Sequence, residues 1–288
     1  MKNQVDLLII TYNQEKYIGE AIESAVNQTY DNVKVVVADD CSTDNTRKVI
    51  DTYYFKYPDK VIRVYNESNL GITGNSNAGL LACNGEYFVI MGGDDVLYPT
   101  KIQQQLDVML RNGNCALCYH DMLVYYGEDD PKNHLYSDVN KPRLGNSAVS
   151  MRYGTFNCAS STMVRSDCIP EYGFDRRLEI ASDFLFWIDV LEKKKGESLY
   201  IPNVLGKYRK HDDNITSTSS FRSLEDHLLT AMVTLSKYPH LRKESLIYLS
   251  GILRRLRRKP SGYLSFLLAS IKVHFSFKAL IAILLYMV

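Results

Sequence analysis

Short apolar runs alternate with amphipathic segments through the N-terminal part of the chain. The runs have the length and the β-branched content of buried strands, and they cover Val5–Ile10, Val33–Ala38, Val61–Tyr65 and the stretch bounded by Gly85 and Gly92. Helical spacing of apolar residues follows the first two runs and Pro99, and a short helix is expected through Asn77 and Leu81, after a loop over Asn69–Gly74. Strands that alternate with helices predict an α/β fold, with a mostly parallel, twisted sheet and helices on both faces.

The pattern is less regular in the second half. There we expect a loop over Asp129–Gly145, a loop and then a strand over Thr155–Val164, a helix over Leu178–Leu191 and a short strand over Val204–Lys210. From Leu224 the sequence is helical in character to its end. With 288 residues, the chain is long enough for one large domain with an appendage. We therefore predict an α/β domain over residues 1–220 and a C-terminal helical region over 221–288.

Polar residues stand at the carboxyl ends of three of these strands. They are Thr11-Tyr12-Asn13 after the first, Asp39-Asp40 at the end of the second, and Asp94-Asp95 after the run that ends at Gly92. Right-handed crossovers align the carboxyl ends of parallel strands along one edge, which is where open α/β sheets hold their ligands. The spacing therefore predicts a single crevice to which all three segments contribute.

The adjacent carboxylates Asp94 and Asp95 suggest a cation site within that crevice. Two hard oxygen ligands suit Mg²⁺ or Mn²⁺, which keeps waters and also binds a diphosphate, and the glycines before them leave room for a ligand near the backbone. The alternative is a turn in which these aspartates cap the helix after Pro99, and capping is likewise the alternative for Asp39-Asp40. The expected convergence of the three segments favours the cation site.

Composition narrows the class of protein. A formal net charge of +1 gives no global attraction to nucleic acid. The six cysteines are scattered, and Cys115-x-x-Cys118 lies in an apolar run with no second pair or nearby histidine at zinc-site spacing, which favours a buried strand. No secretory signal is apparent at the start, so a reducing cytoplasm is the expected compartment.

The C-terminal segment differs in character from the rest. Arg254, Arg255, Arg257, Arg258 and Lys259 form a basic cluster, and residues 263–288 are mostly apolar, with Lys272, His274 and Lys278 as interruptions. The uncharged run after Lys278 is too short to span a bilayer. An interfacial helix beside a polybasic patch, peripheral at the inner face of the cytoplasmic membrane, is the favoured interpretation. The alternative is a helix docked on the α/β domain.

Six ordered motifs over residues 5–220 resemble those of the family-2 glycosyltransferases of GT-A fold, especially bacterial enzymes of surface-polysaccharide synthesis. They are Ile10-Thr11-Tyr12-Asn13, Val37 to Asp44, Asn69-Leu70-Gly71 with Asn77-Ala78-Gly79, Gly93-Asp94-Asp95, Ala181-Ser182-Asp183 and Tyr208-Arg209-Lys210-His211. An arginine usually precedes the asparagine of the third motif, where this chain has Ser76. The commoner form of the fourth has an acidic residue where this chain has Gly92.

The resemblance implies a role for each motif. The nucleotide would contact Thr11, Tyr12, Asn13, Asp40, Asn77 and Asp94, and a base imide N–H donating to Asp40 would indicate uridine or thymidine. Asp95 and His211 would hold the Mg²⁺ or Mn²⁺ ion. Asp183 stands where the family has its catalytic base, although it could also serve as a first-turn acid that complements a helix dipole.

These roles imply an inverting transfer of a sugar from a UDP- or dTDP-sugar to a saccharide or lipid-linked saccharide acceptor, because a single base on the acceptor implies one displacement. Two other functions stay open at this point. A nucleotidyltransferase would also use acidic metal ligands, but the segment after the first strand, Thr11 to Lys16, is not a glycine-rich phosphate loop. A nucleotide-sugar-binding protein without turnover would be consistent with Ser76 and Gly92.

Overall fold

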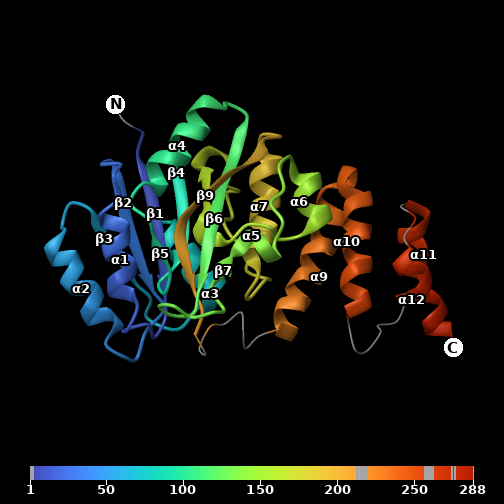
Figure 1. The fold of residues 1–288 in the computed structure, drawn as a ribbon, viewed down its shortest axis with the longest axis horizontal. Helices are drawn as coiled ribbons and strands as arrows, with labels where there is room; N and C mark the ends of the chain where they lie inside the picture. Colours follow the sequence, from blue (N-terminus) through green and yellow to red (C-terminus); the bar gives the residue numbers. More distant parts are fainter. Residues whose placement is uncertain are drawn as a thin grey trace.

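The computed structural model describes residues 3–211, 214, 220–255, 263–273, 275 and 277–287. In these residues the strands form one curled, nine-stranded sheet in the order β3-β2-β1-β4-β8-β6-β9-β5, with β7 paired to β6 (Figure 1). The strands are β1 (Val5–Thr11), β2 (Val33–Asp39), β3 (Val61–Tyr65), β4 (Tyr87–Gly92), β5 (Val96–Leu97), β6 (Cys115–Tyr125), β7 (His134–Leu135), β8 (Thr162–Arg165) and β9 (Glu197–Arg209).

The N-terminal half of the sheet is parallel, as the alternation of strands and helices predicts. Strand β1 pairs in parallel with both β2 and β4, and β2 pairs in parallel with β3. Strand β8 then runs antiparallel to β4 and β6, while β6 and β9 are parallel to each other. The register sets Thr11 beside Asp39 and Ile10 beside Gly92, so the carboxyl ends of β1, β2 and β4 share one edge.

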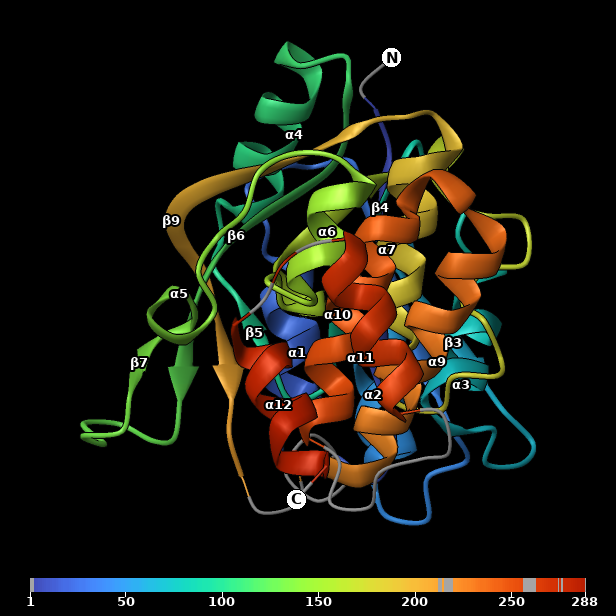
Figure 2. The same ribbon diagram turned by 90° about the vertical axis from the view of Figure 1, so that its right-hand side faces the viewer.

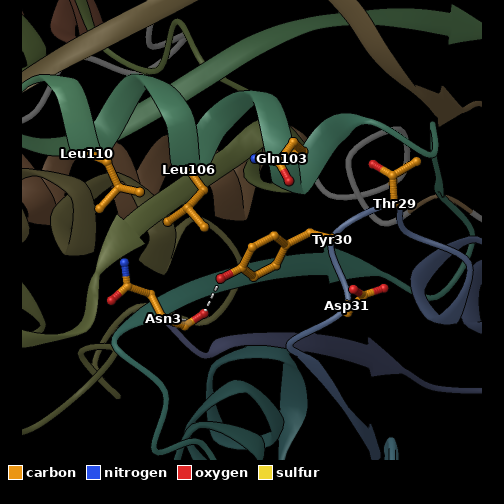
Figure 3. Close-up of a pocket in the computed structure, with 7 residues that line it drawn as sticks. All are labelled: Asn3, Thr29, Tyr30, Asp31, Gln103, Leu106 and Leu110. Carbon is orange, nitrogen blue, oxygen red and sulfur yellow. Dashed lines mark hydrogen bonds between the residues drawn. The ribbon is translucent and has the colours of Figure 1, made fainter. Parts of the chain in front are cut away.

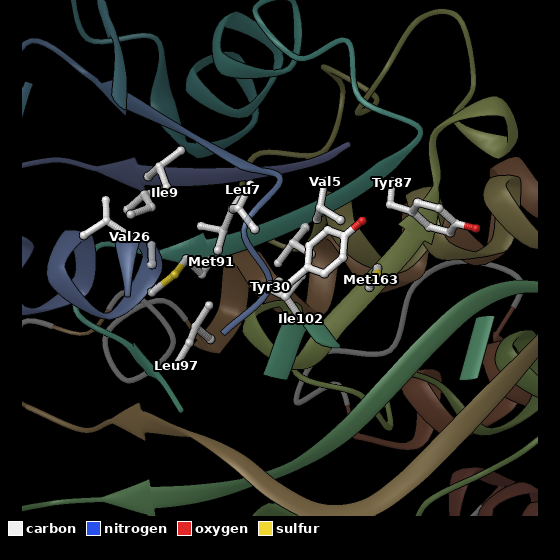
Figure 4. Packing of buried hydrophobic residues seen from close by; sticks show 14 of the residues in the cluster. Val5, Leu7, Ile9, Val26, Tyr30, Tyr87, Met91, Leu97, Ile102 and Met163 are labelled. Carbon is white, nitrogen blue, oxygen red and sulfur yellow. The ribbon is translucent and has the colours of Figure 1, made fainter. Parts of the chain in front are cut away.

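Side chains of β1 alternate between two buried layers, one on each face of the sheet. Val5, Leu7 and Ile9 face α1 (Ile18–Val26), α2 (Thr46–Lys56) and α4 (Lys101–Arg111), and Figure 4 shows this packing. Leu8 faces α3 (Gly71–Leu80) and α7 (Ser182–Lys193). Complete burial of such side chains contributes about 1.5–3 kcal/mol each to the free energy of unfolding. The prediction of a sheet covered on both faces is confirmed.

A third apolar cluster joins the C-terminal helices to the outer side of α7. These helices are α9 (Ser220–Lys237), α10 (Arg242–Arg255), α11 (Tyr263–Val273) and α12 (Phe277–Met287). Within this cluster α10 contacts α6 (Ser147–Tyr153). Tyr263, Leu267 and Ala279 are buried where α11 and α12 pack beside α10, away from the sheet (Figures 1 and 2). One side of α11 and α12 is therefore docked on protein. The division of the chain at residue 220 stays a prediction.

Of the helices in the described ranges, none is long and apolar enough to cross a membrane. The last three residues of the predicted basic cluster, Arg257, Arg258 and Lys259, lie outside the described residues.

Several predicted boundaries shift in the structure. Helix α3 begins at Gly71, inside the expected loop Asn69–Gly74, and α7 begins at Ser182 rather than Leu178. Strand β9 begins at Glu197, because it pairs along the whole of β6, whereas the apolar pattern indicated only Val204–Lys210. The expected loop Asp129–Gly145 contains β7 and the short helix α5 (Tyr136–Val139), which project from the sheet in Figure 2.

The close approach of α3 to the sheet generates a test of the packing. A Cβ atom at Gly79 would lie 2.3 Å from Leu8 Cδ1 and 3.0 Å from the Ala38 Cβ, whereas nothing lies within 4 Å of one at Gly113. We expect Gly79→Ala to lower the free energy of unfolding by about 1–3 kcal/mol, because overpacking outweighs the better helix propensity of alanine. The control Gly113→Ala should change it by less than about 0.5 kcal/mol. Urea unfolding measures both values, and equal stabilities would contradict the packing described.

Candidate functional site

Backbone hydrogen bonds hold the three predicted segments together at the carboxyl edge of the sheet. Asp40 N donates to Thr11 O at 3.0 Å, which links the ends of β1 and β2, and Gly93 N donates to Ile10 O at 2.9 Å, which links the ends of β1 and β4. A Cβ at Gly93 would lie 2.9 Å from Thr11 Cβ, so the two loops approach as closely as a glycine allows. The segments therefore meet at one rim, as the sequence predicts.

The segment after β1 is fixed by the segment after β2. Asn13 has a positive φ of 52°, its Oδ1 accepts from Thr43 N at 2.8 Å, and its own N–H donates to Ser42 Oγ at 2.9 Å. Thr11 is buried and donates from Oγ1 to Gln14 Oε1 at 2.8 Å, whereas Tyr12 is 44% exposed. Of these three predicted nucleotide contacts, Tyr12 therefore offers an open aromatic face, and Asn13 serves the shape of the loop.

Asp39 and Asp40 have different surroundings. Asp39 is fully buried and pairs with Arg47, whose Nε lies 2.5 Å from Asp39 Oδ2. Asp40 Oδ1 accepts from Leu70 N at 2.8 Å and from Asn66 Nδ2 at 2.9 Å, and within the described residues its Oδ2 makes no hydrogen bond. Neither aspartate caps α2, because Asp44 accepts from Thr46 N in the first turn of that helix. Asp40 is itself only 3% exposed, so this carboxylate oxygen without a hydrogen bond belongs to a buried side chain at the rim.

Asp94 and Asp95 are held by residues from distant parts of the chain. Asp94 Oδ2 contacts His211 Nε2 at 3.0 Å and Asn214 Nδ2 at 2.9 Å. Asp95 is buried, accepts from Arg209 N at 3.0 Å through Oδ1, and accepts from Ser160 Oγ through Oδ2. Burial, and then the neighbouring Asp94 charge, raise the pKa of Asp95 well above its usual range. The alternative that these residues cap α4 is wrong, because the cap position there is Thr100.

The residues around Asp94 and Asp95 suit a hard divalent cation. The imidazole of His211 stacks on Tyr17 with ring centroids 4.8 Å apart, and its Nδ1 is buried with no hydrogen-bond partner in the ranges that the structure describes. Two carboxylates and an imidazole are ligands that Mg²⁺ and Mn²⁺ accept. No three acidic, histidine or cysteine side chains of the described residues are close enough to hold a metal ion by themselves. Further ligands would have to come from a diphosphate and water.

Asp183 stands in the first turn of α7 and is partly buried. Burial raises the pKa of its carboxyl to about 6, and the nearby charge of Asp226 adds to the rise. The backbone N–H of Phe184 and the indole of Trp187 act in the opposite direction, although the indole nitrogen makes no regular hydrogen bond within the described chain. A carboxylate with a pKa near 6 can accept a proton at neutral pH and release it again.

The charges of Asp183 and of Asp95, which lies at the rim, both act on the Cys158 thiol. This thiol is buried, and its pKa is raised first by burial and then by the charges of Asp95 and Asp183. The two carboxylates that act on this thiol come from segments almost ninety residues apart in the sequence. The segment that carries Cys158 also reaches the predicted cation site, because Ser160 donates to Asp95.

Asn77 lies apart from these contacts. Its Oδ1 accepts from Phe174 N and its Nδ2 donates to Phe174 O, both at 2.8 Å, and the side chain is buried. Both ends of the amide therefore hold the segment before α7 against α3. Its neighbour Asn75 donates to Ala38 O at 2.9 Å, close to the predicted base contacts.

Several site residues are absent from the sequence prediction. Ser160, Asn214 and Tyr17 contact the predicted ligands directly, and Asn66 contacts Asp40. Arg209 was part of a motif without an assigned role, and its Nε donates to Asp94 O while its Nη2 pairs with Glu20 Oε2 at 2.5 Å. Of these residues, Arg209 lies within a sequence motif. The others do not, and a short polar residue in a loop forms no recognisable sequence pattern.

Two cavities lie at the other edge of the sheet. One, of about 320 Å³, is lined by residues including Asn3, Tyr30 and Leu106, with Tyr30 Oη donating to Asn3 O at 2.7 Å (Figure 3). The other, of about 980 Å³, borders the start of β4 and includes Glu86 and Arg165. Neither is lined by a predicted site residue, so the candidate site stays at the carboxyl edge.

Comparison with known proteins identifies the sequence family that this chain matches. Residues 6–172 match the model of glycosyl transferase family 2. A protein of Rickettsia typhi described as an uncharacterized glycosyltransferase is 31% identical over 257 residues, which cover 86% of this chain and 75% of that protein. A related protein of Rickettsia prowazekii with the same description is 30% identical, with the same coverage.

Solved structures are similar in fold at lower identity. S. aureus TarS 1-349 in complex with UDP-GlcNAc gives a TM-score of 0.66 at 19% identity, covering 94% of this chain and 81% of that one. This chain spans half of the longer TarS chain, with a TM-score of 0.64 at 18% identity and 96% of this chain covered. The mannosyltransferase PcManGT of Pyrobaculum calidifontis, in complex with GDP-Man and Mn²⁺, gives 0.63 at 14% identity, covering 98% and 79%. The chain belongs to glycosyltransferase family 2 and has the GT-A fold.

Proposed function

We propose that the protein is an inverting, metal-dependent glycosyltransferase that moves a sugar from a UDP- or dTDP-sugar to a saccharide acceptor. The observation that supports this most is that backbone hydrogen bonds join the carboxyl ends of β1, β2 and β4 at one rim, which carries Asp40, Asp94 and Asp95. A transferase of this kind needs one group near the departing diphosphate and one near the acceptor hydroxyl. Asp95 and Asp183 are candidates for these two positions.

The donor would lie across the rim. The free Oδ2 of Asp40 would accept the imide N–H of uracil or thymine, and the exposed ring of Tyr12 would contact the base. Thr11 and Asn13 would shape the loop on the nucleotide side, Asn77 would support that side from α3 through its bonds to Phe174, and Asp94 would face the ribose or a metal-bound water. Complexes of similar folds with UDP-GlcNAc and GDP-Man support a nucleotide-sugar donor for this chain as well.

Asp183 would act as the base. The acceptor oxygen attacks the anomeric carbon while the bond from that carbon to the diphosphate breaks, and the hydroxyl proton passes to the Asp183 carboxylate. The nucleoside diphosphate leaves with the electron pair of the broken bond, and a single displacement inverts the anomeric centre. A Mg²⁺ or Mn²⁺ ion bound by Asp95 and His211 would supply Lewis-acid stabilisation of the diphosphate charge.

The acceptor would be a saccharide carried on lipid at the cytoplasmic face of the membrane. Leu268 and Lys272 of α11, Lys278 and Ile281 of α12, and Phe275 between the two helices are exposed. Apolar and basic side chains together suit a surface of anionic lipid. A role in cell-surface polysaccharide synthesis would follow from such an acceptor.

The base assignment predicts the effect of removing the carboxylate charge. Asp183→Asn should lower the rate of nucleoside diphosphate release in the presence of acceptor by about 10²- to 10⁴-fold, because the acceptor proton loses its carrier. The donor affinity should stay within about twofold, as measured by calorimetry. The control Glu179→Gln, an exposed change four residues away, should leave both quantities unchanged. Release of pyrophosphate instead would identify a nucleotidyltransferase, and binding with no turnover in the unaltered protein would contradict an enzyme.

The pKa of Asp183 predicts the acid side of the pH profile. The base must be deprotonated to act, and burial raises its pKa to about 6. The transfer rate should therefore fall tenfold per pH unit below about pH 6 and should level off above it. A rate that stays constant down to pH 4.5, at saturating donor and on folded protein, would rule out this base.

The metal assignment predicts that Mn²⁺ strengthens the stabilising effect of UDP, which can be measured without any sugar transfer. UDP with Mn²⁺ should raise the melting temperature more than UDP alone, because each bound ligand stabilises the folded state. This extra rise should be lost in His211→Ala, and it should be kept in the control His240→Ala, whose side chain contacts Glu192 near the C-terminal end of α7. If Mn²⁺ adds the same rise in melting temperature in both variants, His211 is not a ligand of the cation. If a chelator leaves the rate of sugar transfer unchanged, the enzyme is not metal-dependent.

A further inference from the structure

Helix α9 reaches the point where α7 begins. The carboxylate of Asp226, in the second turn of α9, accepts from Ile180 N at 2.7 Å and from Ala181 N at 2.9 Å, both through Oδ2. Asp226 is buried, at 6% exposure. Acidic side chains of helices usually face solvent, because burying a charge costs free energy unless hydrogen bonds compensate it. The burial of Asp226 therefore requires an explanation.

The two bonded N–H groups stand directly before the proposed base. Ala181 is the cap position of α7, and Asp183 lies two residues further on. Ile180 is the residue before that cap, so a buried carboxylate that receives both N–H groups fixes the direction in which the chain enters the first turn. Asp226 therefore constrains the backbone from which the Asp183 side chain extends.

A second element holds the same turn from the side of α3. Thr73 Oγ1 contacts Leu178 O at 2.5 Å and Ser182 Oγ at 2.9 Å. This contact explains why α7 begins at Ser182, since the residues before it are bonded outward to α3 and α9. The first turn of α7 is thus fixed between the nucleotide side of the sheet and the C-terminal helices.

The charge of Asp226 also acts on Asp183. A nearby like charge disfavours ionisation, and Asp226 contributes in this sense to the raised pKa of Asp183, after the larger effect of burial. Among the described residues, Tyr136 and Cys158 also interact electrostatically with Asp183. The exposed Glu179, before α7, pairs with Arg222 of α9, and the ring of His227, also in α9, lies 5.4 Å from that of Phe184. Of these groups, Asp226 combines burial, backbone contacts and a negative charge.

We propose that Asp226 is a positioning residue for the transfer reaction: it orients the start of α7 through two backbone hydrogen bonds and holds a buried negative charge beside the turn that carries Asp183. This inference rests on the proposed role of Asp183 as the base. It also assigns the C-terminal helices a part in the active site, because α9 belongs to the region that the sequence divides from the α/β domain at residue 220.

Two substitutions separate orientation from charge. Asp226→Asn keeps an oxygen that can accept both N–H groups but removes the charge, so the acid limb of the rate profile should move to lower pH by about half a unit. Asp226→Ala removes the acceptor as well, and the maximal rate should fall by about 10- to 100-fold while the KM for the donor stays within about twofold. The control Glu225→Gln removes the same charge from the adjacent, exposed position of α9 and should change neither quantity.

A purely structural role for Asp226 would lower stability without moving the pH profile. Thermal unfolding of each variant shows what fraction is folded under assay conditions, so that rates are compared on folded protein. An Asp226→Asn profile that coincides with that of the unaltered protein, together with an unchanged maximal rate in Asp226→Ala, would overturn the proposal.

A titration of Asp183 by carboxyl ¹³C NMR keeps this test independent of turnover. The resonance assigned with Asp183→Asn should titrate lower in Asp226→Asn than in the unaltered protein and in Glu225→Gln. If the unaltered protein transfers no sugar and the resonance still shifts, the function proposed for the site fails while the coupling of the two carboxylates stands. An Asp183 pKa that does not shift rejects the coupling whatever the activity.

Discussion

The parallel pairing of β1 with both β2 and β4 is the constraint on which the site depends. It places Thr11 beside Asp39 and Ile10 beside Gly92. The residues that follow these three strands therefore lie next to one another. The apolar side chains of β1 stabilise that pairing from both faces, with Leu7 and Ile9 on one side and Leu8 on the other. The polar rim is therefore a consequence of how the core packs.

The second half of the sheet, in which β8 runs antiparallel to β4 and β6 while β6 and β9 are parallel, supplies what the first half lacks. Strand β9 ends at Arg209, whose backbone N–H and guanidinium contact Asp95 and Asp94, and the chain then continues to His211. The turn before β8 supplies Ser160, which donates to the other oxygen of Asp95. A buried carboxylate is stable only when such donors satisfy it, so the motif Asp94-Asp95 requires partners that lie between 65 and 120 residues away in the sequence.

The sequence predicts the half of this arrangement that repeats a simple pattern. Apolar runs and helical spacing identify β1 to β4 and their crossovers, and the direction of parallel strands then predicts the rim. The extent of β9 does not follow in the same way, because residues 197–203 mix polar and apolar positions and become a strand only by pairing with β6. The partners Ser160, Asn66 and Asn214 are equally hidden, since a short polar residue has the same local signal in any loop. Asp226 looks like any acidic residue of a surface helix until the packing of α9 on α7 is known.

Family membership and the fold are established by the motif order and the comparisons, and the central claim beyond them is that one nucleotide diphosphate bridges the three loop tips. The most direct measurement is a crystal structure of the protein with UDP and Mn²⁺. We predict the uracil N3–H against the Asp40 carboxylate and the diphosphate beside Asp94 and Asp95. A nucleotide bound elsewhere, for example in the cavity beside Tyr30 and Leu106, with the rim left empty, would contradict the account.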